Sequence, residues 1–306
     1  MIKVLEIIMP IMIMILIGMI ARKNNTISQE ANDGLQKFVM NYCLPCVLFN
    51  SCLSAQFSWD SIVSMSLVFI LLLTSSIVSF QLRKKQFPYH NFPLLFSAQE
   101  TGMLGIPLFM TLFSSAYAYR IGVLDVAQAF VAIPVIAILQ ADTTSNPSII
   151  SIIKKVFTSP LLLMSMLGLV LNLSGIINIL NNVGIGSILT SVTSFIGQPV
   201  NAVILFCVGY NFKLEPSNIK QVLKICCLHF VVFAIFCIII QLVLCFVANV
   251  DMQTRWAVLL YCALPGSFLT TGLSKTNEES KISASVCSIL TVLCLIIFCM
   301  MAIIAI

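Results

Sequence analysis

Long apolar runs follow one another along nearly the whole chain, and only short polar segments separate them. A helix needs about 20 apolar residues to cross a bilayer. We count ten runs of that kind, at about 4–21, 31–55, 60–82, 92–115, 118–139, 157–176, 184–212, 218–247, 253–274 and 282–305. Only 9% of the 306 residues are charged, against roughly 25% in a soluble domain. The sequence therefore predicts an all-α polytopic membrane protein with ten transmembrane helices.

The basic residues divide unevenly between the two sides of these predicted helices. Lys3, Arg120 and Arg255 fall on one side, and the other thirteen of the sixteen fall on the other: Arg22, Lys23, Lys37, Arg83, Lys84, Lys85, Lys154, Lys155, Lys213, Lys220, Lys224, Lys275 and Lys281. Short cytoplasmic loops are enriched in Lys and Arg. We therefore expect a multi-pass protein of the cell membrane with both termini on the extracytoplasmic side. The basic residues form no stripe, so nucleic acid is not an expected partner.

The two halves of the chain share a set of landmarks. Their positions differ by 150, 154 and 158 residues for the pairs Gly18 and Gly168, Pro45 and Pro199, and Pro107 and Pro265. Five helices per half is an odd number, so the second half would enter the membrane inverted. We predict a first five-helix repeat at 1–139, a cytoplasmic connecting loop at 140–156 and a second repeat at 157–306. Inverted repeats with matching broken helices are typical of secondary transporters.

Two of the predicted helices carry helix-breaking residues near their middle. Gly102, Gly105 and Pro107 interrupt the fourth helix, and Pro265 and Gly266 interrupt the ninth. A proline removes a backbone hydrogen bond, and within lipid the freed groups must find protein, water or a ligand. Two breaks at one depth can therefore cross and enclose a polar site, although an ordinary proline kink is the alternative for each.

Glu100 lies seven residues before Pro107, about two helical turns away. A carboxylate at that depth costs at least ~2.5 kcal/mol, so it should be protonated, paired or hydrated. Asp125 and Gln128 share one helix face at i, i+3 spacing and either line the same site or clamp two helices together. We predict a coupling role for Glu100 and Asp125. The predicted substrate-binding residues are Glu100, Thr101, Gly102, Gly105, Pro107, Asp125, Gln128, Pro265, Gly266, Ser267 and Thr270.

Enzyme chemistry is not indicated. The chain contains no H-E-x-x-H motif and no close pair of aspartates in adjacent predicted helices. Its two histidines are too far apart in sequence to suggest a metal site. We therefore predict no catalytic residues, no metal and no cofactor beyond a coupling ion, H⁺ or Na⁺.

Three segments resemble motifs of the auxin efflux carrier family, which includes bacterial malate-permease-like proteins. They are ETGMLGIPLF at 100–109, ILFCVGYNFKLEP at 204–216 and YCALPGSFLTTGLSK at 261–275, which resemble that family's fourth, seventh and ninth helices. The resemblance implies a two-repeat carrier whose fourth and ninth helices cross at their prolines. It also implies a scaffold and homodimer surface built from helices 1, 2, 6 and 7, and an elevator-like motion of the others. Substrates in the family are organic anions.

One residue departs from the family pattern, because Glu100 stands where asparagine is common. A negative charge beside an anion site is unfavourable unless the carboxylate binds a proton or a cation. We therefore predict a secondary active transporter, or permease, that moves a small organic anion with H⁺ or another cation. The alternative is a non-transporting membrane sensor or scaffold that keeps the carrier fold.

Overall fold

The computed structural model describes residues 2–55, 59–141, 160–212, 218–246 and 250–305. Within these ranges the chain is helical, and its only β-structure is one isolated bridge. The first half contains α1 (Ile2–Lys23), α2 (Gln29–Phe38), the π-helical turn η1 (Val39–Cys43), α3 (Leu44–Leu53), α4 (Trp59–Lys85), α5 (Leu94–Ser97), the π-helical turn η2 (Thr101–Gly105), α6 (Ile106–Phe113), the 3₁₀ turn η3 (Ser115–Tyr117) and α7 (Ala118–Ala141).

The second half contains α9 (Pro160–Leu173), α10 (Ile176–Asn182), α11 (Ile185–Gly197), α12 (Val200–Asn211), α13 (Ile219–Phe246), α14 (Met252–Ala263), α15 (Leu269–Gly272) and α16 (Asn277–Ala305). Most of the predicted connecting loop 140–156 lies outside the described residues. The division into two repeats therefore stays a prediction.

Six helical segments of the described chain are long and apolar enough to cross a membrane: Leu5–Lys23, Trp59–Lys85, Ser115–Leu139, Ile185–Asn211, Ile219–Phe246 and Asn277–Ala305. The number rises to seven if α9 and α10, which bend by 79°, are taken as one span. The chain is thus a multi-pass membrane protein, and the count of ten stays a prediction. The shortfall has a physical cause, since breaks divide other predicted spans into helices too short to cross alone.

Two prolines stand where helices begin after a π-helical turn. Pro45 lies in the first turn of α3, directly after η1, and Pro107 lies in the first turn of α6, directly after η2. Proline is well suited to this position because the first N–H groups of a helix have no intrahelical partner. A π-helical turn thus joins the two halves of the predicted second helix, and another leads into α6 of the predicted fourth helix.

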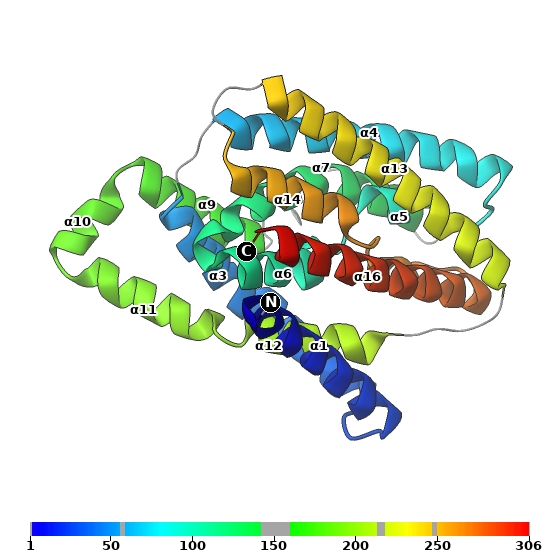
Figure 1. Cartoon of the computed structure of the whole chain (residues 1–306), viewed down its shortest axis with the longest axis horizontal. Coiled ribbons are helices and arrows are strands. Elements are labelled where there is room, and N and C mark those ends of the chain that lie inside the picture. The colour runs from blue at the N-terminus through cyan, green and yellow to red at the C-terminus, as the bar shows by residue number, and fades with distance from the viewer. Residues whose placement is uncertain (1, 56–58, 142–159, 213–217, 247–249, 306) are drawn as a thin grey trace.

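Two helix pairs link the halves of the chain, because α1 packs along α12 and α3 packs along α9 (Figure 1). A glycine allows close approach in each pair. A Cβ atom at Gly18 would stand 2.1 Å from the Phe206 carbonyl oxygen, and one at Gly168 would stand 2.5 Å from that of Phe49. Small residues let membrane helices meet backbone to backbone. Gly18 and Gly168 are landmarks of the predicted repeat, and they occupy corresponding places in the two pairs.

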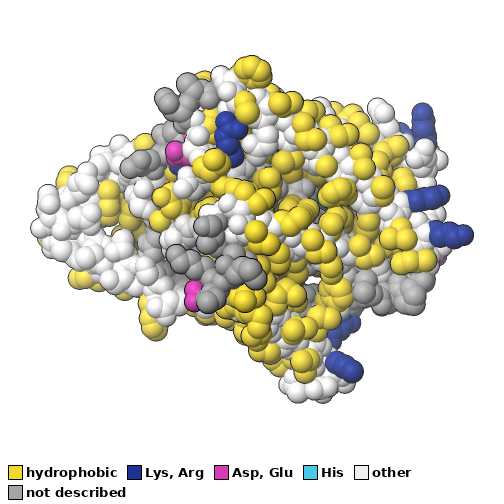
Figure 2. Space-filling view, viewed as in Figure 1, with side chains coloured by type: hydrophobic (Ala, Val, Ile, Leu, Met, Phe, Trp, Pro, Cys, Tyr) yellow, Lys and Arg dark blue, Asp and Glu magenta, His cyan; other side chains and the backbone are white. Residues whose placement is uncertain are grey.

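The remaining long helices form a second bundle. Helix α4 packs against α7 and α13, and α14 packs against α7, α13 and α16. Figure 1 shows α4, α13, α14 and α16 running alongside one another. Lys and Arg side chains gather at the right-hand end of this view, and hydrophobic side chains cover the face between the ends (Figure 2). This distribution is that of a bundle embedded in lipid. Which end faces the cytoplasm stays a prediction.

His90, between α4 and α5, is held as a neutral imidazole at the end of α4 that carries Arg83. Its Nδ1 faces Arg83 Nη2 at 3.0 Å, which requires that Nδ1 accept, and its Nε2 donates to the Leu139 carbonyl at 2.9 Å. The backbone N–H of His90 donates to the buried carboxylate of Glu279. Burial lowers the pKa of His90 below 6.5, and the nearby charges of Lys275 and Arg83 act in the same direction.

Candidate functional site

The two predicted breaks are present, and each contains non-helical backbone. In the fourth predicted helix, α5 ends at Ser97 and residues 98–100 precede η2. In the ninth, α14 ends at Ala263 and residues 264–268 lead into α15. Unpaired backbone groups are expensive inside a membrane, so both stretches need partners from elsewhere in the fold.

Each break supplies those partners to the other. Gln99 pairs with Gly266 in an antiparallel bridge, the Glu100 N–H donates to the Pro265 carbonyl at 3.0 Å, and the Ser267 N–H donates to the Ala98 carbonyl at 2.9 Å. The two interrupted segments therefore meet at their breaks, and we call this contact the crossing. It brings together Glu100, Pro265, Gly266 and Ser267 from the predicted site.

Close approach at the crossing requires glycine at position 266. A Cβ atom there would stand 2.8 Å from the Leu95 carbonyl oxygen and 3.1 Å from the Leu95 Cα. The other two predicted glycines differ, since a Cβ at Gly102 or Gly105 would meet side-chain atoms first, at 2.8 Å in both cases. Side chains can move aside and backbone cannot, so Gly266 has the stricter structural requirement.

Gln128 of α7 holds the crossing together. Its Oε1 accepts from the Gln99 N–H at 2.8 Å and from the Tyr261 hydroxyl at 2.7 Å, while its Nε2 donates back to the Gln99 carbonyl at 2.9 Å. When the Gln99 side-chain amide is oriented with its nitrogen toward the Leu264 and Pro265 carbonyls, the nitrogen donates to them at 2.9 and 3.0 Å. Gln128 thus hydrogen-bonds the backbone N–H and carbonyl groups of Gln99. This contact corresponds to the helix clamp, one of the two roles considered from the sequence.

Asp125 lies one helical turn from Gln128, with its Oδ1 3.4 Å from Gln128 Nε2, and it is half-buried. The i, i+3 pair therefore shares one face, as the spacing predicts. Thr101 is fully buried, with its hydroxyl 3.4 Å from Gln128 Oε1. Thr270 is also fully buried, and its hydroxyl donates to the Ser267 carbonyl at 2.8 Å. Both threonines thus contribute to the local structure of the crossing.

Glu100 is 6% exposed and lies at the crossing. Its Oε1 accepts from the Ser267 hydroxyl at 2.9 Å and from the Phe268 N–H. Among the described residues, only these two groups hydrogen-bond to the Glu100 carboxyl group, and both bind the same oxygen. Glu100 also lines a cavity, which places the carboxyl group between the crossing and open space.

That cavity, of about 480 Å³, extends from Glu100, Met103 and Phe268 to exposed residues of α2 and of the start of α16, among them Lys37 and Lys281. Its walls come from two groups of helices: α2 and α12 on one side, and η2, α15 and α16 on the other. A buried carboxylate, broken helices and a cavity with polar and charged lining residues thus converge at one place. Binding sites commonly combine these features.

The family model described as membrane transport protein matches residues 3–303. The chain belongs to the membrane transport protein family, that of the auxin efflux carriers. A comparison with curated proteins finds no match. Members of this family are transporters rather than enzymes. The family predicted from the three motifs is therefore confirmed. Membrane transport agrees with the fold, which contains several helices able to cross a membrane.

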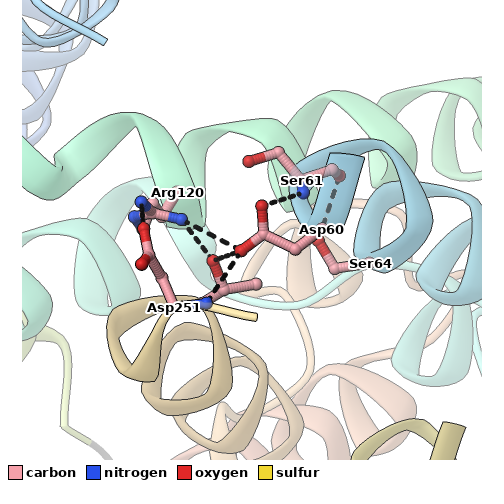
Figure 3. A network of polar contacts seen from close by, with 6 residues as sticks. Asp60, Ser61, Ser64, Arg120 and Asp251 are labelled. Atoms are coloured by element: carbon pink, nitrogen blue, oxygen red, sulfur yellow. Dashed lines mark hydrogen bonds and ion pairs between the residues drawn. The ribbon is translucent and has the colours of Figure 1, made fainter. Parts of the chain in front are cut away.

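The transporter also contains a buried ionic cluster that the sequence reading missed (Figure 3). Arg120 of α7 pairs with Asp60 of α4 at 3.4 Å and with Asp251, which precedes α14. The Thr254 hydroxyl donates to Asp60 Oδ2 at 2.8 Å, and the Ser61 N–H donates to Asp60 Oδ1 at 3.0 Å. The cluster therefore ties together the starts of α4, α7 and α14.

A signal for this cluster was present in the sequence. Asp60, Arg120 and Asp251 all lie at the starts of predicted spans on the same predicted side. Opposite charges at one membrane face can pair, but the sequence does not say which helices are neighbours.

For metals, the described residues contain no group of three His, Cys, Asp or Glu side chains arranged to hold an ion.

Proposed function

We propose that this transporter is a secondary active carrier of a small organic anion in the cell membrane, driven by H⁺ or by another cation such as Na⁺. The observation that supports the proposal is the position of Glu100, a carboxyl group at the crossing that faces a 480 Å³ cavity. Asp125, close to the same crossing, is the second proposed coupling residue.

Electrostatics link the cargo to the coupling ion. Two negative charges brought close in a medium of low dielectric constant repel each other strongly. An anion would therefore enter beside Glu100 only when the carboxyl group carries a proton or contacts a cation. When the anion leaves, the proton can leave as well. Such mutual dependence is a coupling free energy between cargo and ion, and it is the physical requirement for secondary transport.

The arrangement of helices suggests how the site would reach both sides of the membrane. The pairs α1 with α12 and α3 with α9 form one group, and α4 to α7 with α13 to α16 form the other. We propose that the first group is a scaffold and that the second moves against it in an elevator-like way. The cavity beside Glu100 lies between the two groups. We further propose that the scaffold forms a homodimer interface and that both termini are extracytoplasmic.

Uptake by purified protein in proteoliposomes tests the coupling. Succinate, aspartate and a wider set of radiolabelled organic acids would be offered with and without an imposed pH gradient. We expect a gradient, acid outside, to accelerate wild-type uptake of at least one acid, and we expect Glu100→Gln to abolish that acceleration. Glu30→Gln, at an exposed position in the first turn of α2, is the matched control and should behave as the wild type.

Two outcomes would contradict the proposal. Unchanged acceleration in Glu100→Gln would remove Glu100 from the coupling mechanism. Binding of an acid, seen as a higher thermal unfolding midpoint, without uptake of any acid under any gradient would instead favour the sensor or scaffold alternative.

A further inference from the structure

We infer that the cargo carries a protonated amino group as well as carboxylate, with its ammonium group bound at Glu100 and its carboxylate directed toward Lys37 and Lys281. The inference rests on the proposed function, because it names the chemical class of the cargo bound in the same cavity. The cargo's own ammonium group is then the cation that Glu100 contacts when the anion enters. Amino dicarboxylates are the simplest organic anions that meet this description.

The inner end of the cavity offers hydrogen-bond acceptors. Glu100 Oε1 is already occupied by the Ser267 hydroxyl and the Phe268 N–H. Among the described residues, no Lys or Arg side chain makes an ion pair with Glu100, although the carboxyl group is 6% exposed. An ionised carboxylate that is so well buried is stable only with charge-assisted partners. A cargo that supplies N⁺–H donors would complete the hydrogen bonding of the second oxygen.

The outer end of the cavity has the opposite character. Lys37 of α2 and Lys281 of α16 line it from its two walls, and Asp33 is the acidic residue that lines it there. The Asp33 carboxylate accepts from Gln29 Nε2 at 2.9 Å. The charged groups that line this end are thus two ammonium groups and one carboxylate, whereas Glu100 makes the inner end negative when ionised. A solute with an ammonium group at one end and carboxylate at the other matches that separation of charge.

The remaining walls combine polar and apolar side chains. The polar groups are the side-chain amides of Gln29, Gln36 and Asn211 and the hydroxyls of Thr271 and Ser280, and the apolar side chains are Met103, Phe268, Leu269 and Ala284. The polar groups can bind a carboxylate or bridging waters. A cavity of about 480 Å³ lies within the range of small-molecule sites. It has room for a four- or five-carbon amino acid together with water.

Three probes isolate the amino group, because aspartate, succinate and N-acetylaspartate share the same pair of carboxylates on a four-carbon chain. Binding would be measured on the full-length protein in nanodiscs by thermal shift and by competition. We expect aspartate to bind at least about tenfold tighter than the other two, because hydrogen bonds to a charged group are stronger than those between neutral groups. Glu100→Gln should reduce that preference to within about threefold. Glu100→Asp, which keeps the charge, should retain its direction.

Variants at the two ends separate the parts of the recognition. Lys37→Gln and Lys281→Gln should weaken aspartate and succinate alike, since both present carboxylates to that end. Glu30→Gln should change neither affinity. The unfolding midpoint of each variant without probe shows that a lost preference does not come from misfolding.

Wild-type binding of succinate or N-acetylaspartate as tight as that of aspartate would overturn the inference, as would a preference for aspartate that survives in Glu100→Gln. Binding of none of the three probes would also overturn it. The proposed function is tested separately, since gradient-driven uptake of any organic acid that has no amino group would support the carrier and refute the amino cargo.

Discussion

Removing the arginine of the buried ionic cluster should destabilise the transporter more than any other single charge change at that end of the bundle. The Arg120 side chain is 3% exposed and that of its partner Asp60 is 1% exposed. Arg120→Met keeps much of the side-chain volume and deletes the positive charge. Asp60 would then stay buried, with the Thr254 hydroxyl and two backbone N–H groups among its remaining partners.

The magnitude follows from which partner becomes isolated. Breaking a buried ion pair by removing one member costs about 3–5 kcal/mol, because the other charge stays buried without compensation. The second pair contributes little, since the Asp251 side chain is 53% exposed and exposed pairs are worth about 0–1 kcal/mol. We therefore expect a loss of about 3–5 kcal/mol for Arg120→Met, nearly all of it due to Asp60.

A double-mutant cycle measures this directly. Unfolding of Arg120→Met, Asp60→Leu and the double variant would be followed in mixed micelles by circular dichroism against increasing sodium dodecyl sulfate. The double variant should be more stable than Arg120→Met, because apolar replacement of a whole buried pair is often neutral or stabilising. Arg255→Met is the control, since that guanidinium donates to the Leu244 carbonyl rather than to a carboxylate. A double variant as unstable as the sum of the two single variants would refute the reasoning.

Three further predictions use the same unfolding assay. Tyr261→Phe removes a buried hydroxyl that donates to Gln128 at the crossing and should lower the free energy of unfolding by about 1 kcal/mol. Tyr117→Phe, at a more exposed ring, should cause no measurable loss. Equal effects of the two changes would contradict a special role for the crossing. Gly18→Ala places a Cβ 2.1 Å from a carbonyl oxygen and should lower the free energy of unfolding by about 1–3 kcal/mol. A Cβ at Gly34 would meet nothing within 4 Å, so Gly34→Ala should not destabilise the protein. A harmless Gly18→Ala would mean that α1 and α12 separate easily. Because burial lowers the pKa of His90, the unfolded chain binds the extra proton, so wild-type stability should fall as pH drops below about 6.5. His90→Gln should flatten that decline, and an unchanged pH profile would show that His90 does not cause it.

The breaks could be predicted from the sequence because their causes are local. Pro107 and Pro265 interrupt backbone hydrogen bonding whatever surrounds them, and the adjacent Gly266 has no side chain. An apolar environment then forces the freed groups to find partners, and two breaks in matching positions are natural partners for each other. The same reasoning placed Glu100 at the contact between them.

The partners within the site could not be predicted, because they depend on which distant helices are neighbours. Gln128 was expected to contact cargo or clamp helices, and only the fold shows that it hydrogen-bonds the backbone of Gln99. Gln99 itself was not among the predicted residues, although it directly precedes Glu100. Arg120 was used only to orient the predicted helices, since nothing in its local sequence reveals Asp60 in another helix.

The contacts of the glycines distinguish a rigid boundary from one that can slide. Within the α1 and α12 pair, a Cβ at Gly18 would meet backbone, which cannot move aside. Between the proposed scaffold and the proposed moving group, a Cβ at Gly102 would meet the Met40 side chain and one at Gly122 the Leu48 side chain. Side-chain layers can repack at small cost, whereas interlocked backbone resists displacement.

The hydrogen bonds divide in the same way. Gln128 and Tyr261 bind the crossing to α7 and α14, so Glu100 would travel with those helices in any displacement. The other wall of its cavity belongs to α2 and α12 and would stay behind. A shift along the side-chain boundary would therefore leave Glu100 and its bonds to Ser267 and Phe268 intact, while changing which residues face it across the cavity. Cross-linking α2 to α16 through cysteines at positions 37 and 281 should accordingly arrest uptake relative to the same double-cysteine protein in its reduced form, and uptake that continues in the cross-linked protein would rule out the sliding motion.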